Sequence, residues 1–257
     1  MPTYKDWIKE TDINIDYFSG FIKAWIAFNS WYRSEYSERT DRDIIDKIKV
    51  QNNRFKGAIE TLLDKNNTSE NALSFQNYLS KLQTALTNAS IVTQERMGVN
   101  RQISFSEIAI TNPQAQSGGD YRTTRYKVER SRNDVKTTVS KKNDPSTVLF
   151  YFEQEKYDEY ELEIHADFKR LGLEQQGQCL AFYREIIPYK SESVICKDRN
   201  NNITFVSERS KVSRGIIEVL YLLRCSLMHG EVYPDTYSSE VYKNAYYILN
   251  IILKTFL

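Results

Sequence analysis

Arg224 and His229 are the two residues whose types and spacing are best suited to chemistry in this chain. An arginine is always charged and can hold an anion, whereas a histidine changes charge near neutral pH and can take up or release a proton. Both stand near the end of an apolar stretch that reads IIEVLYLLRCSLMHGEVYP. Burying such groups costs stability unless they are paired or used, so the pair is a candidate site.

The residues before His229 predict one long helix. Apolar residues recur there at helical spacing, with Arg224 beside them: Val212, Ile216, Val219, Leu220, Leu223 and Leu227. Gly230 then predicts a left-handed helix terminator. Positions five apart on an ideal helix differ by about 140° in direction, so the two side chains converge only if the helix ends near His229. The alternative is an arginine that extends from a core helix beside a capping histidine.

The segment LLRCSLMHG resembles the signature of the HEPN superfamily, whose nucleases carry an arginine and a histidine near the end of a helix. The match to one bacterial branch covers Arg224, Cys225, Leu227, His229 and Gly230. Ser226 replaces the usual asparagine and lacks the two donors of an amide, and Met228 replaces the usual phenylalanine. A second segment, AWIAFNSWY (Ala24–Tyr32), resembles the first helix of the same branch.

This resemblance implies metal-independent RNA cleavage, with no cofactor, at a site shared by the motif helices of two protomers. His229 would remove the proton of a ribose 2′-OH, and Arg224 would hold the phosphate oxygens as charge builds. The expected products carry a 2′,3′-cyclic phosphate, and DNA should survive. The resemblance points to a toxin or anti-phage defence ribonuclease that acts as a homodimer on RNA. Whether an antitoxin or another regulatory partner restrains it stays open.

The competing hypothesis is a catalytically silent HEPN bundle that serves as a binding or dimerisation module. Ser226 in place of asparagine favours it. Some toxins of the family carry a tyrosine two residues after the histidine that a partner enzyme modifies. Glu231 occupies that position here, and Tyr233 is the nearest tyrosine, so this regulation is not expected.

Residues 14–36 predict the first helix, with one apolar face made by Phe18, Phe21, Ile22, Trp25, Phe28 and Tyr32. Asn29 lies within that face. A buried asparagine must be hydrogen-bonded, either in a structural bond between helices or in orienting Arg224 or a phosphate.

The remaining helices are expected at residues 41–64, with a break near Asn52 and Asn53, from about Asn67 to Ala89, at 175–188 and at 237–257. The sequence therefore predicts a mainly α fold, a HEPN-like helical bundle with a small β-containing insertion between the third helix and the motif helix. We expect a single domain, residues 1–257, with core helices at about 14–89 and 211–257 and an inserted α+β region at about 90–207.

The inserted region is locally basic. Between residues 96 and 142, ten Lys or Arg residues stand against four Asp or Glu residues. Apolar and polar residues alternate around 131–134 as in a hairpin, and a second hairpin is expected at 193–208. Arg122, Arg125 and Arg130 could follow an RNA backbone, or they could lie on a solvated strand edge that resists aggregation.

The composition does not indicate a secreted, membrane or zinc protein. The formal net charge is +1, and no leader or long apolar run opens the chain. Its three cysteines are far apart, which favours reduced thiols, and we expect a soluble cytoplasmic protein. With two histidines, one of them the isolated His165, no metal site is expected.

Overall fold

The structure, a computed structural model, describes residues 16–94, 100–131, 134–198 and 202–257. The chain divides into two compact units. Unit 1 comprises Met1–Ala109 and Ser191–Leu257, and unit 2 comprises Ile110–Lys190. The boundaries of unit 2 lie inside the region of about 90–207 that the sequence assigns to an insertion.

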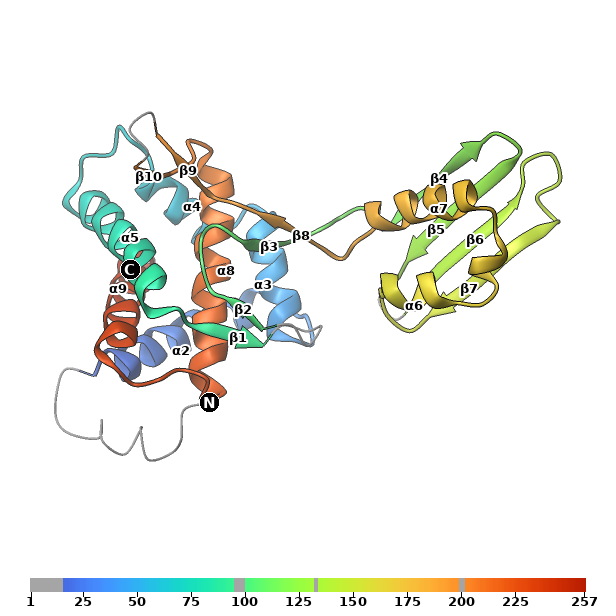
Figure 1. The fold of residues 1–257 in the computed structure, drawn as a ribbon. Coiled ribbons are helices and arrows are strands. Elements are labelled where there is room, and N and C mark those ends of the chain that lie inside the picture. Colours follow the sequence, from blue (N-terminus) through green and yellow to red (C-terminus); the bar gives the residue numbers. More distant parts are fainter. Residues whose placement is uncertain (1–15, 95–99, 132–133, 199–201) are drawn as a thin grey trace. The chain divides into compact units, whose positions relative to one another are not determined.

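Unit 1 holds six of the described helices, with α8 between α3 and the α5–α9 pair (Figure 1). They are α2 (Tyr17–Glu35), α3 (Asp41–Val50), α4 (Arg54–Leu62), α5 (Glu70–Ala89), α8 (Arg209–Met228) and α9 (Thr236–Lys254). Two small antiparallel pairs accompany them, β1 (Val92–Gln94) with β2 (Asn100–Gln102) and β9 (Ile195–Lys197) with β10 (Ile203–Phe205). The expected helices and the second hairpin are confirmed.

Side-chain caps explain where these helices begin. The side chains of Thr40, Asn53 and Ser69 accept hydrogen bonds from the first-turn N–H groups of α3, α4 and α5. Such a cap satisfies a donor that has no partner within the helix. Asn53 therefore causes the expected break between α3 and α4, whereas α5 is capped by Ser69 and not by Asn67.

The predicted apolar stripe places α8 in the core of unit 1. Val212, Ile216, Val219, Leu220 and Leu223 are all buried, while Leu227, in the last turn, is partly exposed. Arg224 thus lies on a helix that packs against the core of unit 1 on most of its faces.

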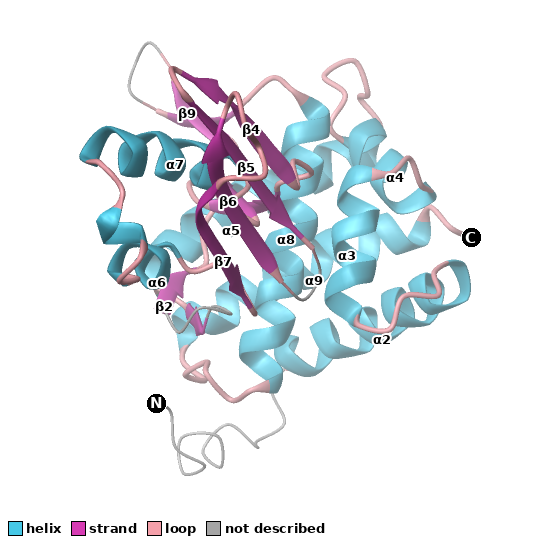
Figure 2. Ribbon diagram, turned by 90° about the vertical axis from the view of Figure 1, so that its right-hand side faces the viewer, coloured by secondary structure: helices cyan, strands magenta, loops and turns pink. Residues whose placement is uncertain are grey.

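Unit 2 is built on an antiparallel sheet in the order β4-β5-β6-β7 (Figure 2). The strands are β4 (Gln116–Tyr121), β5 (Thr124–Arg130), β6 (Val135–Lys141) and β7 (Val148–Gln154). Helices α6 (Glu159–Ile164) and α7 (Leu173–Glu185) and a 3-10 turn, η1 (Phe168–Arg170), follow. Strands β3 (Ile108–Thr111) and β8 (Tyr189–Glu192), which pair with each other, contain the unit boundaries. The hairpin expected around 131–134 is β5–β6, although residues 132 and 133 of its turn lie outside the described residues.

The expectation of a mainly α, HEPN-like helical bundle is wrong. The described residues form a mixed α/β fold, which contains a four-stranded antiparallel sheet as well as the helices. Side chains alternate across a strand, so Tyr126, Val128, Val139 and Phe150 share one face of the sheet. They pack with residues of α7, including Tyr183, in a core of their own. The sheet therefore belongs to a second compact unit that has its own core. No helix in the described ranges is long and apolar enough to cross a membrane.

Candidate functional site

The motif helix ends as the sequence predicts. Gly230 has φ +67°, which is the left-handed conformation that glycine adopts without strain. The N–H of Glu231 donates to the carbonyl of Ser226 at 2.9 Å, and the N–H of Gly230 donates to that of Leu227 at 3.1 Å. This pair of bonds is the Schellman termination. It leaves His229 as the exposed C-cap of α8.

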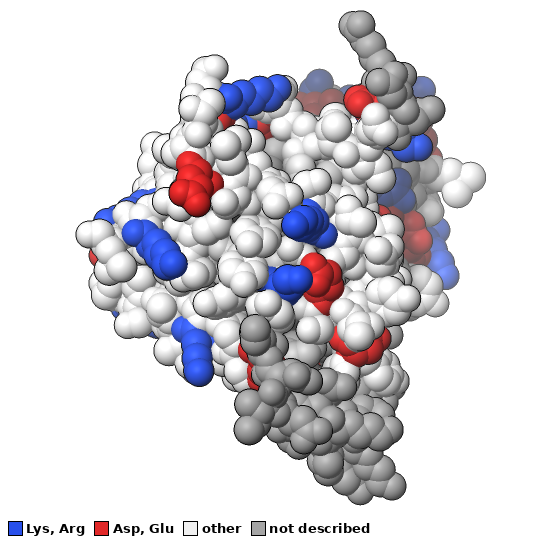
Figure 3. All heavy atoms as spheres, turned by 90° about the vertical axis from the view of Figure 1, so that its left-hand side faces the viewer, with Lys and Arg blue, Asp and Glu red and all other residues white. Residues whose placement is uncertain are grey.

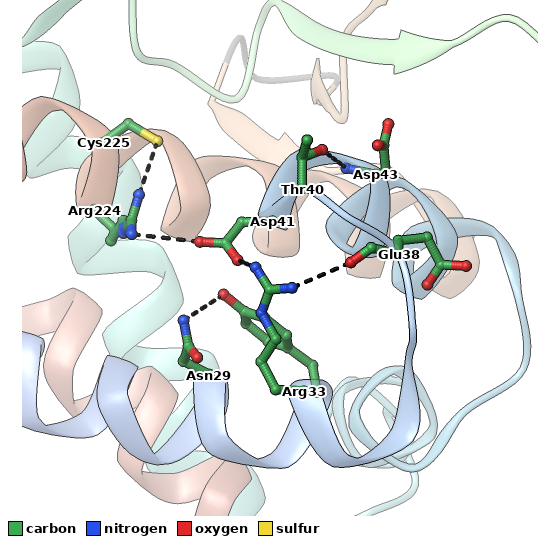
Figure 4. Close-up of polar contacts among 9 residues, drawn as sticks. Asn29, Arg33, Glu38, Thr40, Asp41, Asp43, Arg224 and Cys225 are labelled. Carbon is green, nitrogen blue, oxygen red and sulfur yellow. Dashed lines mark hydrogen bonds and ion pairs between the residues drawn. The ribbon is translucent and has the colours of Figure 1, made fainter.

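Arg224 is held by a residue that the motif does not contain. Its Nη2 lies 3.4 Å from Oδ2 of Asp41, the first residue of α3 (Figure 4). Its Nη1 lies 3.9 Å from Sγ of Cys225. The side chains of Arg224 and Asp41 are 24% and 20% exposed, so the ion pair is partly desolvated but reachable from solvent.

Asp41 also pairs with a second arginine. Nη2 of Arg33, in the last turn of α2, contacts Oδ1 of Asp41, and its Nη1 donates to the carbonyl of Glu38 at 3.1 Å (Figure 4). One carboxylate therefore stands between two guanidinium groups, and the three side chains together are cationic. A site of this kind attracts an anion and still keeps both arginines in place.

Tyr32 and Asn29 extend this network into the core of unit 1. Nδ2 of Asn29 donates to the phenol oxygen of Tyr32 at 2.8 Å, and Tyr32 is fully buried and hydrogen-bonded to Asp41. Burial, and then the negative charge of Asp41, raise the pKa of the Tyr32 phenol, which stays protonated and can donate to the carboxylate. The bond of Asn29 thus lies within α2 and does not join two helices, and Asn29 is connected to Arg224 only by way of Tyr32 and Asp41.

The other two candidate supporting residues lie apart from this network. Ser226 is fully buried, and its Oγ has no hydrogen-bond partner within the described part of the chain, so it faces the core and not a substrate. Tyr233 lies in the segment between α8 and α9 and is 50% exposed.

The three candidate RNA-binding arginines of unit 2 all have partners within that unit. Arg122, with φ +54° in the β4–β5 turn, pairs with Glu174 at 2.5 Å, and Arg125 makes two bonds to Asp120, at 2.8 and 3.2 Å. Arg130 donates to three carbonyls, those of Ile186, Asn112 and Gln114. Burial lowers the pKa of Arg130. Arg130 therefore fastens the sheet to the segments around it and is not on a free loop or edge.

Sequence reasoning missed Asp41 and Arg33. An aspartate directly after a threonine cap is common in the first turn of a helix, where it offsets the helix dipole. This local role is enough to explain the aspartate. The sequence therefore gives no sign that Asp41 also pairs with Arg224, which follows 183 positions later. A search for charged residues that lie beside the predicted apolar face of α2 and lack an oppositely charged partner on the same helix could have identified Arg33.

No group of three or more His, Cys, Asp or Glu residues in the described ranges is arranged to hold a metal ion. Comparisons with protein-family models, with curated proteins and with solved structures found no match for this chain.

Proposed function

We propose that this chain is a metal-independent endoribonuclease that uses Arg224 and His229. The observation that carries the proposal is the arrangement at the end of α8. Asp41 holds Arg224 within reach of solvent, in a cluster of net positive charge, and the exposed His229 follows in the next turn. Similarity of LLRCSLMHG to the HEPN signature supports it from the sequence.

In the proposed reaction, neutral His229 takes the proton of a ribose 2′-OH. The 2′-oxygen then bonds to the neighbouring phosphorus and the bond from phosphorus to the 5′-oxygen breaks. The departing 5′-oxygen takes a proton from solvent, and the protonated His229 returns its own proton to solvent. Arg224 has five N–H donors, and its contacts with Asp41 and Cys225 involve two of its nitrogens. Its remaining donors can stabilise the charge that builds on the phosphate.

The proposed active form is a homodimer. Within the described residues, no hydrogen bond or ion pair joins Arg224 to His229 of the same chain. A second copy could supply the missing partner at each site. Met228 and Tyr233 beside the motif are 58% and 50% exposed, as expected of residues that a partner covers. A strict monomer by solution mass would contradict this part of the proposal.

The resemblance extends the proposal to a cytoplasmic toxin or defence effector. In that role, expression of the chain should stop cell growth and His229→Ala should restore it.

The test is incubation of RNA with purified protein in excess EDTA, beside His229→Ala, Arg224→Ala and a DNA strand of the same sequence. We expect cleavage of RNA alone. Loss of the general base should slow it by about 10²–10⁴-fold, and loss of Arg224 by about 10²–10³-fold. The double variant should be little worse than the poorer single one, because both groups serve one transition state. Cleavage that needs a divalent metal, or that persists in His229→Ala, would refute the proposal.

A binding or dimerisation module without catalysis is the second candidate. The burial of Ser226 favours it, because this side chain cannot take the place of an asparagine that contacts substrate. A dimer in solution together with intact RNA in the same EDTA assay would select this function.

A further inference from the structure

Arg33 is the second cation of the cluster, and its position suggests a use beyond the pairing with Asp41. Its side chain is 41% exposed, compared with 24% for Arg224. The contacts with Asp41 and with the carbonyl of Glu38 engage Nη2 and Nη1. A guanidinium has five donors, so the exposed part of Arg33 can bind another acceptor.

The charges around Arg33 favour an anion. Asp41 is shared with Arg224, and the carboxylate of Glu38 is paired with Lys47, whose hydrogen bond lowers the pKa of Glu38. Asp43 points away from Arg33 (Figure 4).

Both guanidinium groups contact one carboxylate, Arg33 at Oδ1 and Arg224 at Oδ2. The two guanidinium groups are therefore held at a fixed separation, on opposite sides of the Asp41 carboxylate, which is smaller than a nucleotide. In a single RNA strand, phosphates also follow one another at short intervals, each with one negative charge. Two adjacent cations at a fixed separation suit two consecutive phosphates better than one.

We propose that the exposed part of Arg33 forms a second anion subsite that holds the phosphate next to the scissile one. The proposal rests on the proposed ribonuclease function and narrows its substrate to RNA with at least two consecutive phosphates. Arg33 is then a substrate-binding residue, and Asp41 positions it together with Arg224.

The experiment compares a dinucleotide, which has one internucleotide phosphate, with a trinucleotide, which has two. Arg33→Ala should raise KM for the trinucleotide about 10-fold more than KM for the dinucleotide, which is the usual effect of losing one charged hydrogen bond. Arg33→Lys should restore part of the effect. Arg39→Ala is the matched control, because Arg39 lies exposed in the connection between α2 and α3 and its loss changes the net charge equally.

A structural role for Arg33 gives a different result. If Arg33 only orients Asp41, its loss should impair both substrates alike, and that outcome would overturn the subsite, as would equal effects of Arg33→Ala and Arg39→Ala. Binding of a 2′-O-methyl trinucleotide, which cannot be cleaved, separates the two proposals. Weaker binding by Arg33→Ala together with no cleavage of RNA by the unmodified chain would retain the subsite and refute the ribonuclease.

Discussion

Asp41 connects the two arginines, the buried Tyr32 and the start of α3, so one carboxylate fixes the geometry of the whole cluster. Its contact with Arg224 spans 183 positions of sequence and brings α3 to the motif helix. A guanidinium that binds a phosphate benefits from such a fixed partner, because its side chain loses less conformational freedom when the substrate binds.

We expect Asp41→Asn to lower kcat for RNA cleavage about 10- to 100-fold, because a displaced Arg224 meets the transition state poorly. The amide keeps the shape of the side chain but loses its charge, so it cannot hold two guanidinium groups equally well. Asp43→Asn, in the same helical turn, is the control and should leave kcat within about twofold. Equal losses in the two variants would show that Asp41 acts through the helix dipole alone.

The three cysteines should differ in reactivity. Burial raises the pKa of the Cys179 thiol to about 12, whereas Cys196 is exposed and Cys225 is partly exposed. Because the thiolate is the reacting form, only about one Cys179 thiol in 10⁴ is ionised at pH 8. In native protein treated with iodoacetamide and analysed by peptide mass spectrometry, Cys196 should be modified first and Cys179 last. Urea should abolish this order, and modification of native Cys179 as fast as Cys196 would contradict its burial.

At the scale of single residues, the sequence predicts those features that depend only on neighbouring positions in the chain. Gly230 predicts its own left-handed conformation, since the end of an apolar stripe followed by glycine is a local signal. The pairing of Asp41 with Arg33 and Arg224 was not predictable, because it depends on which helices meet, and no pattern within one helix records that.

At the scale of elements, the position of α8 depends on one close approach. A Cβ on Gly215 would lie 2.9 Å from Cγ2 of Val194, which is fully buried. The segment that carries Val194 therefore crosses α8 where a side chain is missing, about two and a half turns before Arg224.

Gly215→Ala should destabilise the protein by about 1–3 kcal/mol in urea unfolding, because the new methyl group overpacks this crossing. Val194→Ala should relieve the clash in the double variant. Gly57→Ala in α4 is the control, since nothing lies within 4 Å of its would-be Cβ, and it should stabilise by about 0.5–1 kcal/mol. Destabilisation by both substitutions would mean that the crossing at Val194 is not the cause.

Helices α3 and α8 are also joined by a buried ion cluster. Oε1 of Glu218 lies 2.6 Å from Nη1 of Arg42, and Oε2 lies 2.7 Å from Nζ of Lys49. Glu218 and Lys49 are each 1% exposed. Removing one partner from such a pair leaves a buried charge uncompensated.

Glu218→Gln should therefore lower the free energy of unfolding by about 3–5 kcal/mol in a urea titration. Glu240→Gln removes an exposed pair with Lys243 and should cost at most about 1 kcal/mol. If both variants lost similarly little unfolding free energy, Asp46 would be sufficient to balance the charges of Arg42 and Lys49, which it also contacts, without Glu218.

The helices of unit 1 were predictable because their apolar stripes repeat over many turns and their caps are explicit. The four-stranded sheet was not, because β6 and β7 give only a few alternations each, and Thr137 is buried on the core face among apolar residues. A period of two over seven residues is a weak signal, and a bulge between Val139 and Ser140 interrupts it further.

At the scale of the whole molecule, the proposed binding of RNA is expected to depend on a local group of charges, because the overall charge is small. The net charge is +1, and charged side chains are few and separated on the side of unit 1 where α5 and α9 lie (Figure 3). Such a surface offers no continuous track for a phosphate backbone. The cluster of Arg33, Asp41 and Arg224 is thus the better candidate for RNA contact, and the paired arginines of unit 2 are weaker ones.

The two ends of unit 2 are adjacent, so the role of this unit can be tested by deleting it. The N–H of Asn112, directly after β3, donates to the carbonyl of Pro188, directly before β8, at 2.8 Å. A two-residue Asn-Gly turn can close a hairpin of that kind, so it can replace residues 112–188. The proposed catalytic residues and the residues that hold them all belong to unit 1.

We expect the shortened chain to keep the helical circular dichroism of unit 1 and a kcat for RNA cleavage within about threefold of the full chain. If unit 2 adds RNA contacts, KM rises on deletion, and Arg122→Glu with Arg125→Glu in the full chain raises it too and flattens its salt dependence. Arg130 is left unchanged there, because its three carbonyl contacts hold the sheet. A shortened chain that is folded and dimeric but inactive would show that catalysis needs unit 2, and the assignment of the active site to Arg224, His229 and Asp41 alone would fail.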